Sequence, residues 1–410
     1  MRNKNNILML TSIYPSENNG GTPVCHYFAR DWVKLGYNVI AIHIHPLFPV
    51  FYYWAAKLLK KRIEARTGNI VDTIRETQTK KFIRDGVKVY RIQIKKNMPH
   101  GNFLSKSLYD AKLEIKELLE DENFVPDYIC GHFPNPQIEL IFYLKSIFPD
   151  VVTAYISHGD DLRVDIRNIY GECYEKAYRK SIDIFGYRSV PIQKEFEQKY
   201  GSAANSFICY SGIPEEFVSK KRHVFNGSIN HFCFLGSLFE LKKVDVTIRA
   251  LAKSFPEKNF RFDIIGGGAE YGSLVHLVKT LGIEKQVKFY GKVQRNIAQE
   301  IMEEADCFIM VSSHEAFGLV YLEAMGKGLI SIGTKGQGID GVIRNSENGF
   351  LCPSDDVDAL SNIIDKIRSL DSNQRQKISD KAIETARSLT DMKAAQLYIN
   401  ALESVKKIKI

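Results

Sequence analysis

Two glutamates, Glu315 and Glu323, have the type and spacing that could hold a polar ligand. The apolar run Cys307–Val311 predicts a strand just before them, and a helix is expected to begin near residue 318. The first N–H groups of a helix have no partner within it and suit an anion; here they belong to Phe317, Gly318 and Leu319. An unpaired carboxylate at Glu323 among apolar neighbours is costly, and two ribose hydroxyls would offset that cost. The alternative is that Glu323 pairs with a lysine and Glu315 only caps the helix.

Two lysines mark a second candidate anion site, in the loop that starts at Gly236 and Ser237. Lys242 and Lys243 stand directly before a stretch at 244–255 that is expected to be helical. A helix N-terminus disfavours cations unless an anion also binds there, so the pair points to a phosphate. Ordinary solvated lysines are the alternative.

A third loop follows the first apolar run and contains Gly20 and Gly21, which let a backbone pass close to a ligand. Thr22 is expected to be an N-cap with Pro23 at the first helical position, so that free N–H groups favour a phosphate or sugar oxygen. An ordinary tight turn is the alternative. The glycine fingerprint of dinucleotide-binding folds is missing after this strand.

The elements that must position these loops alternate, because apolar runs of strand length are separated by amphipathic stretches of helix length. This pattern occurs twice and predicts two α/β domains, each with a doubly wound parallel sheet. Strands are expected near 7–12, 39–44, 87–94, 128–132, 152–157, 184–187 and 207–210, and again near 232–236, 261–266, 287–291, 307–311 and 329–333. Ligands of such sheets bind in the loops beyond the carboxyl ends of the strands.

The predicted domains are an N-terminal, acceptor-side unit at 1–212 and a nucleotide-sugar-binding unit at 230–390. A linker at 213–229 joins them. The final helix, at 391–410, is expected to pack back onto the first domain. A basic amphipathic insertion is expected at 46–85.

Composition narrows the class of protein. The chain has 410 residues, of which 44% are hydrophobic and 25% charged, which is typical of a globular protein. No apolar run approaches the roughly 20 residues of a membrane-spanning helix, and no secretory signal is evident. The seven scattered cysteines form no ligand or disulfide pattern, so reduced thiols and a cytoplasmic location are expected.

The net positive charge of the chain comes from one segment, since residues 51–100 hold 13 Lys and Arg against 4 Asp and Glu, whereas the whole chain has a formal net charge of +8. A helix after Pro49 would gather aromatic and aliphatic residues on one face and lysines on another. This composition indicates peripheral contact with an anionic membrane, at its inner face. The residues expected at the membrane are Phe51, Trp54, Leu58, Lys57, Lys60 and Lys61. The alternative is that the helix packs its apolar face on the first domain; nucleic acid is not expected, because the aromatics are not interleaved for base stacking.

Several motifs together resemble glycosyltransferase family 4, a group of retaining enzymes with the GT-B architecture of two facing Rossmann-like domains. The most specific motif is Glu-x7-Glu, present as Glu315 to Glu323. Others follow the family's order: Ile264-Ile-Gly-Gly-Gly-Ala269, which contains Gly266, then Gly336-Gln-Gly-Ile-Asp340, and, in the first half, His158-Gly-Asp-Asp161. The resemblance covers nearly the whole chain.

The resemblance implies a role for each matching residue. Glu323 would hold the ribose, Glu315 a hydroxyl of the donor sugar, and Lys242 the phosphate. The amides of residues 317–319 would bind the diphosphate or the sugar, and His158 would meet the donor sugar or the leaving oxygen. Ser237 departs from the pattern, because the family usually has an arginine there, and a serine supplies no positive charge. Asp161 is expected to cap the helix that follows it.

The expected function is metal-independent, retaining transfer of a hexosyl group from a UDP- or GDP-linked sugar. The acceptor would be a glycan or a lipid-linked glycan, in the synthesis of a surface polysaccharide, with no cofactor and no metal. The other enzyme classes considered are a sugar-nucleotide epimerase of the same fold and an NAD oxidoreductase. A non-catalytic nucleotide-sugar-binding protein is the remaining alternative.

Overall fold

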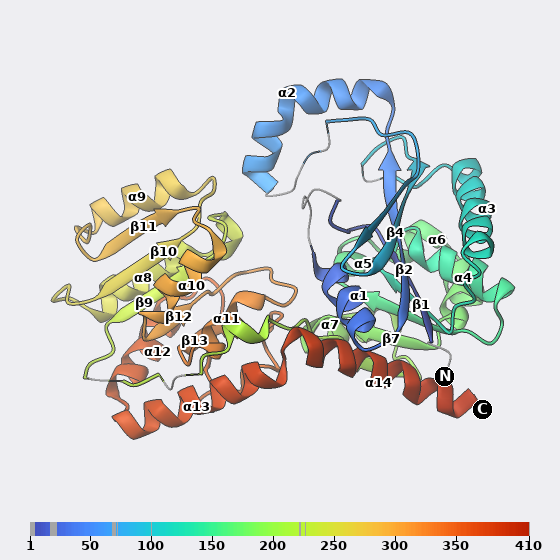
Figure 1. Cartoon of the computed structure of the whole chain (residues 1–410). Coiled ribbons are helices and arrows are strands. Elements are labelled where there is room, and N and C mark those ends of the chain that lie inside the picture. The colour runs from blue at the N-terminus through green and yellow to red at the C-terminus, as the bar shows by residue number, and fades with distance from the viewer. Residues whose placement is uncertain are drawn as a thin grey trace.

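The computed structural model describes residues 5–16, 23–67, 71, 73–99, 101–220, 223–225 and 227–409. In this part of the chain, two sheets with helices on their faces lie side by side, as Figure 1 shows. This is the GT-B architecture of two α/β domains with parallel sheets, so the predicted fold class is confirmed.

The first sheet has the strand order β3-β4-β2-β1-β5-β6-β7-β8. Its strands are β1 (Asn6–Thr11), β2 (Asn38–Leu47), β3 (Lys80–Arg84), β4 (Val87–Lys95), β5 (Tyr128–His132), β6 (Val152–Ser157), β7 (Ile184–Tyr187) and β8 (Ser206–Ile208). Its helices are α1 (Val24–Lys34), α2 (Val50–Thr67), α3 (Ser105–Asp121), α4 (Gln137–Ile147), α5 (Asp160–Arg163), α6 (Ile166–Tyr170) and α7 (Val190–Tyr200). The strands pair in parallel except for β3, which pairs antiparallel with β4.

The second sheet has the order β11-β10-β9-β12-β13-β14, with every pair parallel. Its strands are β9 (His231–Leu235), β10 (Arg261–Ile265), β11 (Val287–Gly291), β12 (Cys307–Ile309), β13 (Ile330–Thr334) and β14 (Phe350–Cys352). Its helices are α8 (Val244–Ser254), α9 (Tyr271–Thr280), α10 (Arg295–Glu303), α11 (Leu319–Gly326), α12 (Val357–Ser369) and α13 (Ser372–Ser388).

In the first sheet, strand register places the loops that carry candidate site residues at the carboxyl ends of neighbouring strands. In the first sheet Thr11, at the end of β1, is the register partner of His132 in β5, which in turn faces Ile156 in β6. The loops that follow β1, β5 and β6 therefore leave the sheet together. Because helices cover both faces, β1 is fully buried from Ile7 to Leu10 and appears in the sequence as a continuous apolar run.

The chain crosses between the two halves twice, and the crossings are paired. Ile213 bridges Thr390, and the amide of Asp391 donates to the Ile213 carbonyl oxygen at 2.9 Å. A Cβ at Gly212 would lie 2.2 Å from the Thr390 carbonyl carbon, so a glycine is required for this approach. The final helix, α14 (Asp391–Lys409), then runs along the first half, where Trp32 of α1 donates to the Ala395 carbonyl oxygen at 3.2 Å (Figure 1).

Several local expectations need correction. The edge strand β3 was not predicted, because its sequence Lys-Lys-Phe-Ile-Arg is charged and only Phe82 is buried. The short β14 was also not predicted. Pro23 is the N-cap of α1 and not its first helical residue. The segment expected to be a linker contributes Ile213, Val218, Phe225 and Ile229 to the core of the second half.

Candidate functional site

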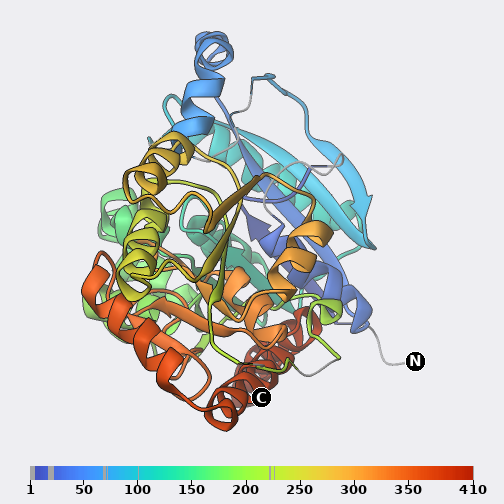
Figure 2. The same cartoon turned by 90° about the vertical axis from the view of Figure 1, so that its left-hand side faces the viewer.

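A cavity of about 390 Å³ lies between the loops of the two sheets. His158 and Gly159, after β6, and Ser189, before α7, line it from the first half. Glu315 and Gln337 line it from the second half. His158 and Glu315, which the sequence singled out in different halves, therefore line the same cavity. Figure 2 shows the second half in front and the first half behind it.

Gly318 gives the N-terminus of α11 its shape. Its φ of 82° lies in the left-handed region, and a Cβ there would lie 2.7 Å from the ring of Tyr321. Since α11 begins at Leu319, the N–H groups of residues 317–319 stand at the helix terminus, without a partner within the helix. The Phe317 ring is buried, 5.4 Å from the ring of Tyr210.

Glu315 forms an ion pair with Lys242, whose Nζ lies 2.5 Å from its carboxylate oxygen. The main chain of Glu315 is also fixed, because Gly338 donates to its carbonyl oxygen at 2.8 Å and Gln337 Oε1 accepts from its amide at 3.0 Å. The loop at 336–340 therefore positions Glu315. The alternative that Glu315 caps the helix is wrong, because the N-cap of α11 is Gly318 and has no side-chain cap bond.

Glu323 is nearly buried, with 8% of its side chain exposed, and it is paired. Arg295 donates to one carboxylate oxygen at 2.7 Å, and Gln299 donates to the other. Glu323 is therefore paired, as the alternative expected, but its charged partner is Arg295 of α10 and not a lysine. The Arg295 side chain is 46% exposed and its guanidinium lies 4.5 Å from the centre of the Phe217 ring, so it covers Glu323 from the outside.

Gln299 adds an unsatisfied group to this site. Its Oε1 is buried and has no hydrogen-bond partner among the described residues. A buried amide oxygen without a donor costs about 1–3 kcal/mol, which a ligand hydroxyl or N–H could recover. The sequence did not identify Arg295 or Gln299, because they lie 28 and 24 positions from Glu323 and form no motif with it.

The two lysines of the second loop have different ion-pair partners. Lys243 has a left-handed φ of 51° and pairs with Asp355 at 2.8 Å, so only Lys242 meets Glu315. Gly266 packs against the same loop, since a Cβ there would lie 1.8 Å from the Gly236 carbonyl oxygen. Ser237 is exposed and supplies no cation.

His158 lies against His132 and Phe133. His158 Nε2 is 3.0 Å from His132 Nδ1, and its ring stacks on Phe133 with centroids 4.0 Å apart. Burial lowers the pKa of His158 well below its usual range, so the imidazole is neutral at pH 7.

Asp161 does not cap a helix, and that prediction is wrong. Its carboxylate accepts hydrogen bonds from the hydroxyls of Tyr155 and Ser157, each at 2.7 Å. Gly159, with a left-handed φ of 89°, is the N-cap residue of α5 instead. Asp161 is fully buried and fixes the start of the loop that carries His158.

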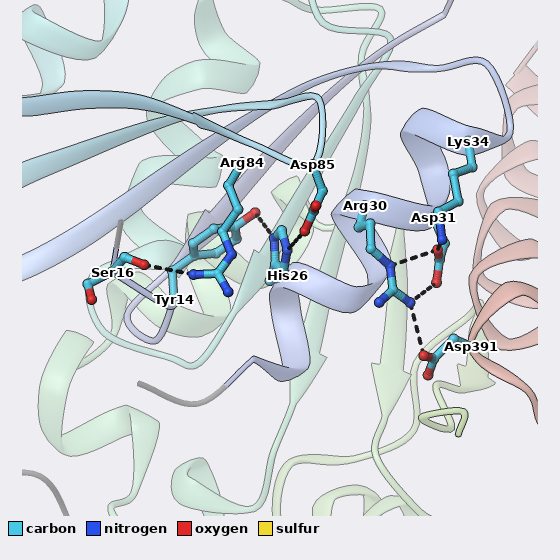
Figure 3. Close-up of polar contacts among 9 residues, drawn as sticks. All are labelled: Tyr14, Ser16, His26, Arg30, Asp31, Lys34, Arg84, Asp85 and Asp391. Atoms are coloured by element: carbon cyan, nitrogen blue, oxygen red, sulfur yellow. Dashed lines mark hydrogen bonds and ion pairs between the residues drawn. The ribbon is translucent and has the colours of Figure 1, made fainter. Parts of the chain in front are cut away.

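Gly20, Gly21 and Thr22 of the first loop lie outside the described residues. The chain before it is anchored at two points, as Figure 3 shows. Tyr14 bonds His26 of α1 at 2.9 Å, and His26 bonds Asp85 of the β3–β4 turn at 2.8 Å. Arg84 of the same turn donates to the Ser16 carbonyl oxygen at 2.7 Å.

Helix α2 projects from the first half, at the top of Figure 1. Phe51, Trp54 and Leu58 have exposed fractions of 69%, 69% and 68%, whereas Tyr53 and Ala56 are buried. The alternative, in which α2 packs its apolar face on the first domain, is therefore wrong. Lys57 is exposed as well, and the side chain of Lys61 is outside the described residues. In the described part of the chain, no helix combines the length and the apolar character needed to cross a membrane.

Part of the chain is similar in sequence to known glycosyltransferases. Residues 216–385 match the profile of the family described as Glycosyl transferases group 1. N-acetyl-alpha-D-glucosaminyl L-malate synthase of Bacillus anthracis is 34% identical over 142 residues. That match spans 35% of this chain and 37% of the length of the relative.

Two solved structures share the architecture across both halves. The lipopolysaccharide outer core galactosyltransferase WaaB, in its apo form, has a TM-score of 0.68 and 16% identity, covering 97% of this chain and 99% of that one. HepE from Anabaena, in complex with UDP and glucose, has a TM-score of 0.61 and 18% identity, with 97% and 99% covered. The fold is therefore GT-B. The part of the chain that is similar to glycosyl transferases group 1, residues 216–385, belongs largely to the second half of this fold.

Proposed function

We propose that this protein is a retaining glycosyltransferase of family 4 that takes its sugar from a nucleoside diphosphate. The observation that carries the proposal is the cavity between the two halves, where Glu315, bonded to Lys242, faces His158. The match of residues 216–385 to glycosyl transferases group 1 supports the reaction class. The UDP and glucose held by HepE support a UDP-linked donor, with a GDP-linked donor as the alternative.

In this proposal Glu323 accepts the ribose hydroxyls, Glu315 accepts a hydroxyl of the sugar, and Lys242 meets the diphosphate. The leaving group gains negative charge as the anomeric bond breaks. The N–H groups at the start of α11 and the Lys242 ammonium lower the barrier by stabilising that charge. Because Ser237 adds no cation, Lys242, with support from Lys243, takes a larger share of this task than in relatives with an arginine. No metal takes part, and no protein nucleophile is assigned.

The acceptor is proposed to be a glycan or a lipid-linked glycan, entering beside His158 from the first half. The exposed apolar residues of α2 support contact with a membrane, and the lysines of the basic segment favour anionic lipid. Lys57 and Lys60 belong to the same helix. The proposed role is surface-polysaccharide synthesis at the inner face of the membrane.

The test is a thermal-shift panel of UDP-, GDP- and ADP-sugars, followed by assays of nucleoside diphosphate release. A ligand that binds only the native state stabilises it by about 2.7 kcal/mol at one hundred times its Kd. Release of diphosphate that depends on an acceptor supports the transferase. Isomerised donor without an acceptor would indicate an epimerase, and binding without turnover would indicate a non-catalytic binding protein.

A further inference from the structure

A buried cysteine and two histidines lie together beside the cleft. Cys25 is in the first turn of α1, His132 ends β5, and His158 follows β6. A ligand atom from each of the three lies within 4.8 Å of the other two. The described residues contain no second group of this kind. The proposed transfer reaction gives Cys25 no task.

We propose that Cys25, His132 and His158 bind a zinc-class divalent cation. A tetrahedral zinc ion lies about 2.3 Å from sulfur and 2.0–2.1 Å from nitrogen, which separates its ligand atoms by roughly 3.3–3.7 Å. The two histidine nitrogens are already 3.0 Å apart. The sulfur lies within 4.8 Å of both nitrogens, so it would have to approach them by at most about 1.1–1.5 Å to complete the set. One thiolate and two imidazoles select zinc over magnesium or calcium, which prefer oxygen ligands.

The charges around the group make the cysteine decisive. Arg188 is buried and donates to the Cys209 carbonyl oxygen at 2.7 Å and to the Ser211 hydroxyl. Its guanidinium opposes a second cation nearby, so a site built from two neutral imidazoles alone would bind poorly. A thiolate removes one unit of that charge, and Cys25 is the one ligand of the set that can supply it. Loss of Cys25 should therefore weaken binding more than loss of an ordinary third ligand.

The site opens toward the cleft through His158, which lines the cavity of about 390 Å³. Cys25 and His132 are fully buried, so they form the closed side of the group. An ion held there would occupy His158 Nε2, the nitrogen that now faces His132. The proposed binding does not depend on the proposed function.

Cobalt titration of the full-length, chelator-treated protein tests the binding. Co²⁺ in a tetrahedral site with a thiolate ligand gives visible bands and a near-ultraviolet sulfur-to-metal band, and competition with Zn²⁺ then gives the zinc affinity. The wild type should bind one equivalent. Cys25→Ser should lose the sulfur band and at least about tenfold in zinc affinity, since even loss of an outer-shell partner costs that much. Cys173→Ser, at an exposed free cysteine, is the matched control and should behave as wild type.

His158→Asn provides a second variant at a half-buried position, in case Cys25→Ser does not fold. Its sulfur-to-metal band should be weaker than that of the wild type or absent. It should also bind zinc at least about tenfold less tightly than the wild type does. No cobalt binding by the wild type, or unchanged zinc affinity in both variants, would overturn the proposal. A chain that binds cobalt through Cys25 but transfers no sugar would keep the metal site and remove the proposed function.

Discussion

The candidate site and helix α2 differ in whether their unusual residues have partners within the chain. In the candidate site, each charged group that the sequence singled out has a partner: Lys242 pairs with Glu315, which lines the cavity, and Arg295 pairs with Glu323. On α2, the large apolar side chains of Phe51, Trp54 and Leu58 are exposed to solvent. A buried charge without a partner is far more costly than an exposed apolar side chain. The charged groups of the candidate site are therefore stabilised by partners within the chain, whereas α2 exposes an apolar surface.

This difference has a functional consequence. In the proposed function, a nucleotide sugar would replace contacts that the candidate site already makes, so its binding would be an exchange of partners. A membrane would only cover apolar area on α2, which breaks no existing pair. Variants in the cleft should therefore change rates and nucleotide affinities, and variants on α2 should change where the protein partitions.

The largest effect is expected from Lys242→Ala. Loss of a preorganised cation beside the leaving diphosphate should slow transfer by about 100- to 1000-fold, with a smaller change in donor affinity. The measurement is steady-state release of nucleoside diphosphate. Lys253→Ala removes an exposed ion pair with Asp358 in the same half and is the control. Wild-type turnover in Lys242→Ala would contradict the assignment.

Glu323→Ala should mainly weaken nucleotide binding. Hydrogen bonds to a charged group contribute about 1.5–3 kcal/mol, which corresponds to a loss of about 10- to 100-fold in affinity. Titration calorimetry with UDP and GDP measures it. Glu303→Ala, at a more exposed glutamate of α10, is the matched control. Equal affinities for Glu323→Ala and the control would remove Glu323 from the nucleotide site.

On α2, the triple change of Phe51, Trp54 and Leu58 to serine should reduce binding to anionic vesicles by at least about tenfold, since each side chain contributes on the order of 1 kcal/mol when partly buried. Cosedimentation measures this partition. Tyr109→Ser with Leu113→Ser, at exposed positions of α3, is the control and should bind as wild type. An unchanged distribution of the triple variant would remove the membrane contact.

The smallest effect is expected from Arg295→Ala, and the direction of the change in nucleotide affinity is informative. If Arg295 is bonded to the Glu323 carboxylate oxygens that the ribose hydroxyls would use, its removal should raise nucleotide affinity a few-fold. This matches the 0.2–1 kcal/mol that a partly exposed ion pair contributes. Calorimetry with the same nucleotides decides this. A loss of affinity would show that Arg295 itself binds the nucleotide, and the exchange of partners would then be wrong.

The sequence predicted the fold well because parallel strands covered on both faces are continuous apolar runs. The expected strands at 128–132 and 287–291 coincide with β5 and β11. Strand β3 was not predicted from the sequence, because an edge strand needs few apolar residues. For the site, Glu315 and Lys242 were each marked by local motifs, and the structure adds that they touch.

What the sequence could not give are contacts between distant segments. The pairing of Glu323 with Arg295 spans 28 positions, and a buried carboxylate does not specify which cation it meets. Asp161 shows the same limit, because an aspartate before a helix suggests a cap until two hydroxyls from β6 are found beside it. The cysteine of the proposed metal group, in α1, has no ligand at motif spacing, since its partners lie at the end of β5 and after β6.

The most direct test of the account is a crystal structure of the complex with the nucleoside diphosphate that stabilises the protein most. The account predicts ribose oxygens at the Glu323 carboxylate, phosphate oxygens near Lys242 and the start of α11, and Arg295 displaced from Glu323. A nucleotide bound elsewhere, with the Arg295–Glu323 pair intact, would contradict it.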